Sequence, residues 1–165
     1  MLHSVFDIIE TPVGKLAILC SDEGVYEIIW ENKLIEKATQ KRFAKLKQHP
    51  RHPHILETKK QLKEYFNNKR KTFDLPLKAL GTEFQKKVWK ELSKIPYGKT
   101  ISYGEQAKRL GDAKKARAVG TANGRNPLSI IIPCHRVISG SGSLGGFGGG
   151  IENKKFLLAL EGYPG

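Results

Sequence analysis

Long apolar runs are absent from this 165-residue chain. None approaches the roughly 20 residues that a membrane-spanning helix needs, and Asp7 and Glu10 interrupt the N-terminus where a secretory signal would be apolar. Only two cysteines are present, Cys20 and Cys134, which excludes a disulfide-stabilised scaffold and is typical of free thiols in a reducing compartment. We therefore expect a soluble cytoplasmic protein, not associated with membranes, in which both cysteines are reduced.

Acidic residues are scarce as well. The chain has 16 Asp and Glu against 29 Lys and Arg, which gives a formal net charge of +13. Such an excess of positive charge favours a polyanionic partner, and nucleic acid is the leading candidate. Charge alone leaves one alternative open, a solvated cationic surface without a particular partner.

Metal ligands and nucleotide-binding motifs do not form convincing groups. His49, His52 and His54 lie close together, but prolines separate them and no cysteine or carboxylate cluster accompanies them. The glycine-rich stretch 140–150 is not followed by the Gly-Lys-Ser/Thr of a phosphate-binding loop. We therefore expect neither a metal nor an organic cofactor.

Turn residues and apolar patterns predict two lobes, residues 1–78 and 79–165. In the first lobe, three short β-rich runs read as an antiparallel meander, and two helices on either side of a His-Pro breaker at 49–54 would cover it. The predicted strands are Val5–Glu10, Lys15–Cys20 and Gly24–Trp30, and the predicted helices are Leu34–Leu46 and Ile55–Phe66.

The second lobe has the punctuation of a helical domain. Thr82 is a candidate helix cap, followed by an apolar stripe that we expect to be core. Helices predicted over Ser102–Leu110 and Ala113–Asn123, separated by Gly111-Asp112, have the length of a helix-turn-helix. A packing helix with solvated lysines is the alternative. The stripe consists of Phe84, Val88, Trp89 and Leu92.

The second predicted helix could meet a nucleic-acid duplex. Its small residues, including Gly120, leave room for close approach, and its basic residues can contact phosphates. The basic residues are Lys114, Lys115, Arg117 and, just beyond the helix, Arg125.

Cys134 is the strongest chemical candidate in the sequence. The run Ile130–Ile132 predicts a buried strand, and Pro133 favours a tight turn that begins with the cysteine. A thiol with an ordinary pKa is only about 3% ionised at neutral pH, so a reactive cysteine needs an activator, and the adjacent His135 is a candidate base. The alternative is a buried structural thiol beside a surface histidine.

A series of short motifs in the second half of the chain favours a reactive Cys134 over a structural thiol. Taken in order, these motifs resemble those of the O6-alkylguanine-DNA alkyltransferase family. The Pro-Cys-His-Arg segment is highly specific when it occurs with the others. The resemblance runs from about Gly81 to Glu161, whereas the first 78 residues match only loosely. The motifs are Gly81–Gln85, Val88-Trp89, Ile95–Tyr103, Arg117–Gly120, Asn126-Pro127, Pro133–Val137 and Gly145–Phe147.

The resemblance implies an α+β fold, with a ribonuclease H-like N-terminal lobe and a winged-helix-like C-terminal lobe carrying the helix-turn-helix. It implies a monomer that repairs double-stranded DNA by moving the alkyl group of O6-alkylguanine, and also of O4-alkylthymine, to Cys134 once per molecule. Arg117 would occupy the space left by the extruded base. Two alternatives are a module that recognises alkylated DNA without transfer, and a cysteine hydrolase.

Further roles follow from the resemblance alone. His135 would take the thiol proton through a water, Glu161 would orient His135, and Tyr103 would lie near N3 of the guanine. Asn126 would tie the recognition helix to the active-site loop.

The resemblance also implies a guanine pocket. Phe147 stands where the family usually has tyrosine, so stacking is kept and a hydroxyl is lost, and Ser129 stands where some relatives have a proline. The expected pocket residues are Ser129, Val137, Leu144, Phe147 and Gly148.

Overall fold

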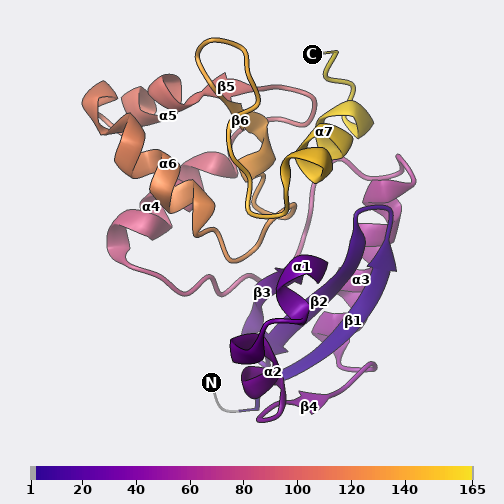
Figure 1. Ribbon diagram of the computed structural model, residues 1–165. Helices are drawn as coiled ribbons and strands as arrows, with labels where there is room; N and C mark the ends of the chain where they lie inside the picture. The colour runs from indigo at the N-terminus through magenta and orange to yellow at the C-terminus, as the bar shows by residue number, and fades with distance from the viewer. Residues whose placement is uncertain (1–2, 165) are drawn as a thin grey trace. The chain divides into compact units, whose positions relative to one another are not determined.

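The computed structural model describes residues 3–164, and the chain forms two compact units that divide between Leu80 and Gly81. Each unit contains its own sheet and helices (Figure 1). Among the described residues, no helix is both long and apolar enough to cross a bilayer. The two units are therefore taken one at a time.

The N-terminal unit is built on a four-stranded sheet in the order β3-β2-β1-β4. Its first three strands form the predicted antiparallel meander. The short strand β4 adds to the predicted elements and pairs in parallel with β1, so the sheet is mixed and not purely antiparallel. Two residues are too few for an alternating pattern to reveal a strand. The strands are β1 (Val5–Thr11), β2 (Gly14–Ser21), β3 (Gly24–Trp30) and β4 (Lys47–Gln48).

Strand β2 is covered on both faces, which explains its unbroken apolar run. Residues Leu16 to Cys20 have no exposed surface. Helix α3 (Pro53–Phe66) contacts β1, β2 and β3, and the short helices α1 and α2 lie on the other face of the sheet (Figure 1). The core of this unit is therefore a sheet between two helical layers.

The single helix predicted over Leu34–Leu46 is wrong. The chain forms α1 (Glu31–Leu34) and α2 (Lys37–Phe43), separated at Ile35 and Glu36. Leu34 and Phe43 both pack on the same apolar cluster of the sheet. Nine residues of continuous helix would place these two side chains on opposite sides of its axis, so the helix has to break for both to reach the sheet.

The histidine-rich segment is the start of a helix and not only a breaker. Helix α3 begins at Pro53, and His52 is its N-cap, with Nδ1 accepting a hydrogen bond from the backbone N–H of His54 at 3.1 Å. The same ring lies 3.5 Å from the Cys20 sulfur and 3.1 Å from the Asp22 carboxylate. Within residues 3–164, no group of three or more His, Cys, Asp or Glu side chains is arranged to hold a metal ion.

The C-terminal unit opens with α4 (Glu83–Leu92), which begins at a complete capping box between Thr82 and Gln85. Trp89 is buried and its indole N–H donates to the carbonyl of Ala122, 2.9 Å away, which fixes α4 against α6. Phe84 departs from the predicted core stripe because 37% of it is exposed.

The predicted helix-turn-helix is present as α5 (Tyr103–Arg109) and α6 (Ala116–Gly124), joined through the single turn of 3₁₀ helix η1 (Ala113–Lys115). The two helices are held by a reciprocal pair of buried amide hydrogen bonds between Gln106 and Asn123, at 2.9 and 2.7 Å. Two buried amides that satisfy each other fix both the distance and the rotation of the helices.

The strand predicted over Ile130–Ile132 is wrong. The chain turns there, with Ile130 at a φ of +76°, a conformation that a β-branched side chain rarely adopts. The side chain of Asn126 stabilises the turn, because it accepts from the N–H of Leu128 at 3.0 Å and donates to the carbonyl of Ile132 at 2.8 Å. The apolar run indicates burial, and these residues are buried, but it does not indicate conformation.

The remaining elements surround this turn. The 3₁₀ turn η2 (Cys134–Arg136) leads into β6 (Val137–Ile138), which pairs in parallel with β5 (Ile101–Ser102). A glycine-rich loop then leads to the last helix, α7 (Ile151–Leu160).

Candidate active site

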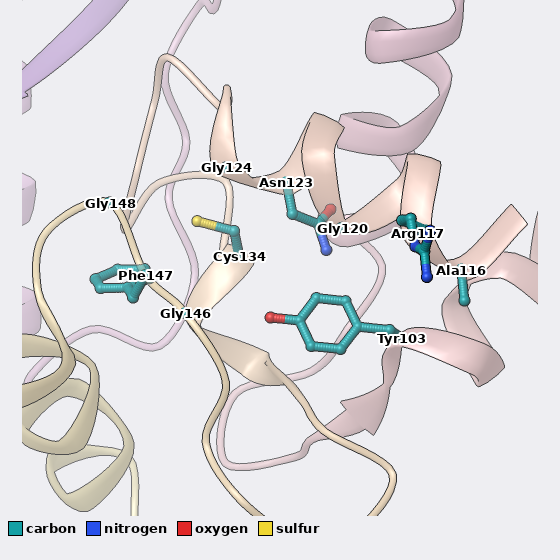
Figure 2. A pocket seen from close by; sticks show the side chains of 10 residues that line it. All are labelled: Tyr103, Ala116, Arg117, Gly120, Asn123, Gly124, Cys134, Gly146, Phe147 and Gly148. Atoms are coloured by element: carbon teal, nitrogen blue, oxygen red, sulfur yellow. The ribbon is translucent and has the colours of Figure 1, made fainter.

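A pocket of about 460 Å³ opens beside Cys134 in the C-terminal unit. In Figure 2 the cysteine side chain lies between the rings of Phe147 and Tyr103, and the Tyr103 hydroxyl points toward the middle of the pocket. Most of the other lining residues are small, so their side chains take up little of the cavity. The lining residues are Tyr103, Ala116, Arg117, Gly120, Asn123, Gly124, Cys134, Gly146, Phe147 and Gly148.

Cys134 is the first residue of turn η2 and is only 7% exposed. Burial raises the pKa of its thiol, and hydrogen bonds from the side chains of Asn126 and Ser129 and the charge of Lys154 oppose this effect only in part. The resting thiol is therefore protonated at neutral pH. A thiol in this state needs a base at the moment of reaction.

His135 follows Cys134 directly and is the candidate for that base. Its Nε2 lies 2.7 Å from a carboxylate oxygen of Glu161, and both side chains are fully buried. Since an ionised carboxylate can only accept, Nε2 carries the hydrogen and Nδ1 keeps its lone pair. Nδ1 is buried and has no hydrogen-bond partner among residues 3–164. Burial lowers the pKa of His135 despite the opposing effect of Glu161, so the ring is neutral and able to take a proton.

Arg136 completes this buried network. Its Nε and Nη2 donate to the two carboxylate oxygens of Glu161 at 2.8 and 3.1 Å, and its Nη1 donates to the carbonyl of Ile95 at 2.7 Å. Burial by itself raises the pKa of Glu161, but the hydrogen bonds from His135 and Arg136 outweigh it and hold that pKa well below its usual range. The carboxylate therefore stays ionised and holds the imidazole in one tautomer.

Tyr103 forms one wall of the pocket at the start of α5. Gly120 of α6 lies against its ring, where an added Cβ would come within 3.5 Å, and Gly145, at a φ of +75°, lies against its hydroxyl, where an added Cβ would come within 3.0 Å. Burial raises the pKa of Tyr103, so its hydroxyl keeps its hydrogen and can donate it to a ligand.

The predicted DNA-contacting side chains are all exposed and basic. Arg117 lies at the rim of the pocket, whereas Lys114, Lys115 and Arg125 are not among the residues that line it. Lys115 lies 6.0 Å from the ring centre of the half-exposed Phe84. These exposed basic residues on and beside α6 form a cationic surface suited to phosphate groups.

Three of the predicted pocket residues lie elsewhere. Val137 is fully buried, Leu144 lines a separate cavity of about 240 Å³, and Ser129 is buried behind Cys134. Phe147 and Gly148 do line the pocket. Leu144 differs because neighbouring residues of the glycine-rich loop face different cavities, whereas Val137 and Ser129 lie outside this loop and are buried in the core.

Sequence reasoning missed several residues of the site. Ala116, Asn123, Gly124 and Gly146 line the pocket as well. Their position on the inner side of α6 or beside Phe147 could have indicated them. Buried Lys154 had no comparable signal, because a lysine within a mostly polar helix start normally indicates a solvated position.

Comparison with known proteins agrees with this geometry. Residues 83–163 match the family "6-O-methylguanine DNA methyltransferase, DNA binding domain", and residues 4–79 match its "ribonuclease-like domain". The chain belongs to the 6-O-methylguanine DNA methyltransferase family. The ribonuclease-like domain corresponds to the sheet unit, and the DNA-binding domain corresponds to the unit that contains the pocket.

Members of this family from several organisms align along nearly the whole chain. The methylated-DNA--protein-cysteine methyltransferase of Methanosarcina acetivorans is 41% identical over 162 residues, which cover 98% of this chain and 99% of the relative. The constitutive enzyme of Bacillus subtilis is 42% identical, with 92% of each protein covered.

Solved structures of the family show the same fold. The O6-methylguanine methyltransferase of Mycobacterium tuberculosis superposes with a TM-score of 0.85 at 40% identity, covering 96% of this chain and 92% of that one. A structure of the same mycobacterial protein in complex with DNA gives a TM-score of 0.84 at 40% identity, covering 94% and 91%. The α+β fold expected from the sequence is confirmed.

Proposed function

We propose that this protein repairs alkylated DNA by direct reversal, moving the alkyl group from O6 of guanine, and from O4 of thymine, to Cys134. The observation that carries the proposal is the buried thiol at the pocket, followed by His135 and its carboxylate Glu161. Membership of the methyltransferase family supports the same chemistry.

The reaction is a displacement at the alkyl carbon. The Cys134 thiol loses its proton through a water to Nδ1 of His135, and the imidazolium is stabilised by Glu161. The sulfur–carbon bond forms as the carbon–O6 bond breaks, and the bonding electrons remain on the guanine. Tyr103 donates a hydrogen bond to N3 of the leaving base. The proton taken from the thiol passes from His135 through water to N1 of the base, so guanine leaves neutral and His135 is neutral again. The product thioether is stable, so each molecule reacts once and needs no cofactor.

A guanine within a duplex cannot reach a buried sulfur, so the base must leave the stack. Arg117 at the pocket rim is in a position to fill the gap, which offsets part of the few kcal/mol that extrusion costs. The neighbouring basic side chains contact phosphates of double-stranded DNA. We further propose that the protein acts as a monomer, as the family resemblance implies, and that it works in the cytoplasm, where thiols stay reduced.

Intact-mass analysis tests the proposal. The protein is mixed with a duplex containing one O6-methylguanine, beside a Cys134→Ser control and an unmodified duplex. We expect a gain of about 14 Da that saturates at one equivalent and is absent in both controls. Tight binding of the lesion without a mass change would contradict transfer and indicate a recognition module, and an ester-hydrolysing activity would indicate the hydrolase alternative.

A further inference from the structure

Lys154 is an unusual lysine for a soluble protein because no part of it is exposed. Among residues 3–164, no carboxylate lies within ion-pair distance of its ammonium group. Its neighbour on α7, Lys155, is exposed and pairs with Glu152 at 3.5 Å. A buried cation without a counter-charge is costly, so its contacts must compensate.

Those contacts connect three segments of the chain. From α7, the Lys154 ammonium donates to the carbonyl of Val137 on β6 at 2.7 Å and to the carbonyl of Gly146 in the glycine-rich loop at 3.4 Å. It also lies 6.0 Å from the ring centres of both Tyr103 and Phe147, a distance at which a cation is attracted to an aromatic face. Gly146 and Phe147 belong to the pocket lining.

Residues Gly146–Gly148 of the glycine-rich loop line the pocket and form what we call the pocket wall. The glycines on both sides of Phe147 contribute no side chain that could pack and lose the most conformational entropy on ordering. The N–H of Gly150 donates to the carbonyl of Phe147 at 3.0 Å, which closes a turn at the end of this segment. The ammonium supplies up to three donors from one atom, which suits a point where several carbonyls meet.

We propose that Lys154 is a positioning residue whose cation holds the pocket wall against β6, so that Phe147 stands in place before the alkylated base arrives. The inference rests on the proposed function, since it concerns the pocket in which the transfer takes place. In this role Lys154 keeps the pocket wall ordered and does not transfer a proton.

The charge state of Lys154 makes this role pH-dependent. Burial lowers the pKa of Lys154 to about 8, while the nearby Cys134 opposes the shift. The cation is therefore present at pH 7 and is lost as the pH rises through about 8. The other titratable groups that face it are His135 and the Tyr103 hydroxyl. As the pH rises, loss of the Lys154 cation should lower the transfer rate, whereas easier ionisation of the Cys134 thiol should raise it. The two effects of pH on the transfer rate are therefore opposite in sign.

Single-turnover transfer from an O6-methylguanine duplex tests the role. Lys154→Met keeps the length of the side chain and removes the charge, and Lys155→Met is the matched control one residue away. We expect the limiting transfer rate of Lys154→Met at pH 7 to fall at least tenfold, with duplex affinity changed less than twofold and the control within twofold of the wild type. An unchanged limiting rate would refute the inference.

A second reading assigns the same cation to the thiolate, and iodoacetamide separates the two. This small electrophile reacts with the thiol and does not need an ordered guanine pocket. We expect the rate at which iodoacetamide alkylates Cys134 to fall less than threefold in Lys154→Met. An equal loss in both reactions would show that the charge acts on the sulfur and would overturn the positioning role.

Hydrogen exchange measures the wall directly and does not depend on transfer. Peptides that span Gly145–Gly150 are followed by mass spectrometry, with helix α3 as an internal reference for the intrinsic effect of pH. We expect at least fivefold faster exchange in Lys154→Met at pH 7, and the same acceleration in the wild type between pH 7 and 9. Equal protection in all three samples would refute the inference, whereas a wild-type protein that is protected but does not alkylate itself would refute only the proposed function.

Discussion

The ion pair between Arg136 and Glu161 offers a quantitative test of the buried network. Removing either partner leaves the other charge buried without compensation, which costs about 3–5 kcal/mol of unfolding free energy. Arg136→Met and Glu161→Gln are therefore each expected to destabilise the C-terminal unit by that amount. In the double variant neither charge remains, but the amide that replaces the carboxylate keeps only one accepting oxygen for the donors of His135 and Gly98, so one of them loses its acceptor at about 1–3 kcal/mol.

The double variant should consequently lose less than the sum of the two single variants, with a coupling energy of at least about 2 kcal/mol. Coupling of this size is expected because the side chains of Arg136 and His135 together donate three hydrogen bonds to one buried carboxylate. An exposed pair on α4 provides the matched control. Lys86 and Glu83 lie 3.7 Å apart and are solvated, so their cycle should give no more than about 0.5 kcal/mol.

The assay must report on one unit, because a chain of two compact units can unfold in two transitions. The two tryptophans lie one in each unit, Trp30 on β3 and the buried Trp89 on α4. In a Trp30→Phe background, fluorescence during urea denaturation follows the C-terminal unit through Trp89 alone. Additive losses for Arg136 and Glu161 within about 0.5 kcal/mol would refute the reasoning, because they would show that the charges do not depend on each other.

Two further predictions concern acid stability and DNA binding. Burial lowers the folded-state pKa of His135, so the unfolded chain binds the extra proton first and stability falls as the pH drops below about 6.5, by up to about 1.4 kcal/mol per pH unit. The unfolding free energy of His135→Gln should therefore fall less steeply than that of the wild type between pH 7 and 5. Urea midpoints that change in parallel with pH in the two proteins would contradict the prediction. Lys114→Ala and Lys115→Ala should each lower the slope of log affinity against log salt by about 1 for undamaged duplex, measured by fluorescence anisotropy, with an unchanged slope contradicting a phosphate contact.

Local signals in the sequence predict much of this fold. The antiparallel meander, the cap at Thr82 and the two helices of the helix-turn-helix are all present, because each depends on neighbouring residues along the chain. The boundary of α3 differs because His52 caps the helix with its ring nitrogen, a use of histidine that composition does not reveal.

Other features depend on contacts that no local pattern records. Ile130 adopts its left-handed conformation because Asn126 closes the turn around it, and three adjacent β-branched or apolar residues look like a strand without that information. The break between α1 and α2 follows from the need of Leu34 and Phe43 to reach one cluster. Tertiary packing overrides local propensity at each of these positions.

The buried charges are the least predictable part of the site. Arg136 and Lys154 are ordinary basic residues in the sequence, yet their partners lie far along the chain, 25 residues away for Arg136 and Glu161 and 17 for Lys154 and Val137. A motif can nominate Cys134 and His135 because they are adjacent. It cannot nominate a lysine whose partners are main-chain carbonyls.

The resting state of the site explains how a thiol that can be used only once is preserved. Burial raises the pKa of Cys134 and lowers that of His135, so both groups are neutral before the substrate arrives. The ion pair that reacts must form within a desolvated site, and Glu161, already ionised, lowers the cost only on the imidazole side. A stray electrophile that meets the neutral thiol therefore reacts slowly. In the proposed mechanism, a guanine held in the pocket beside the sulfur and the Tyr103 donor supplies the alkyl carbon with which the thiolate of that ion pair reacts.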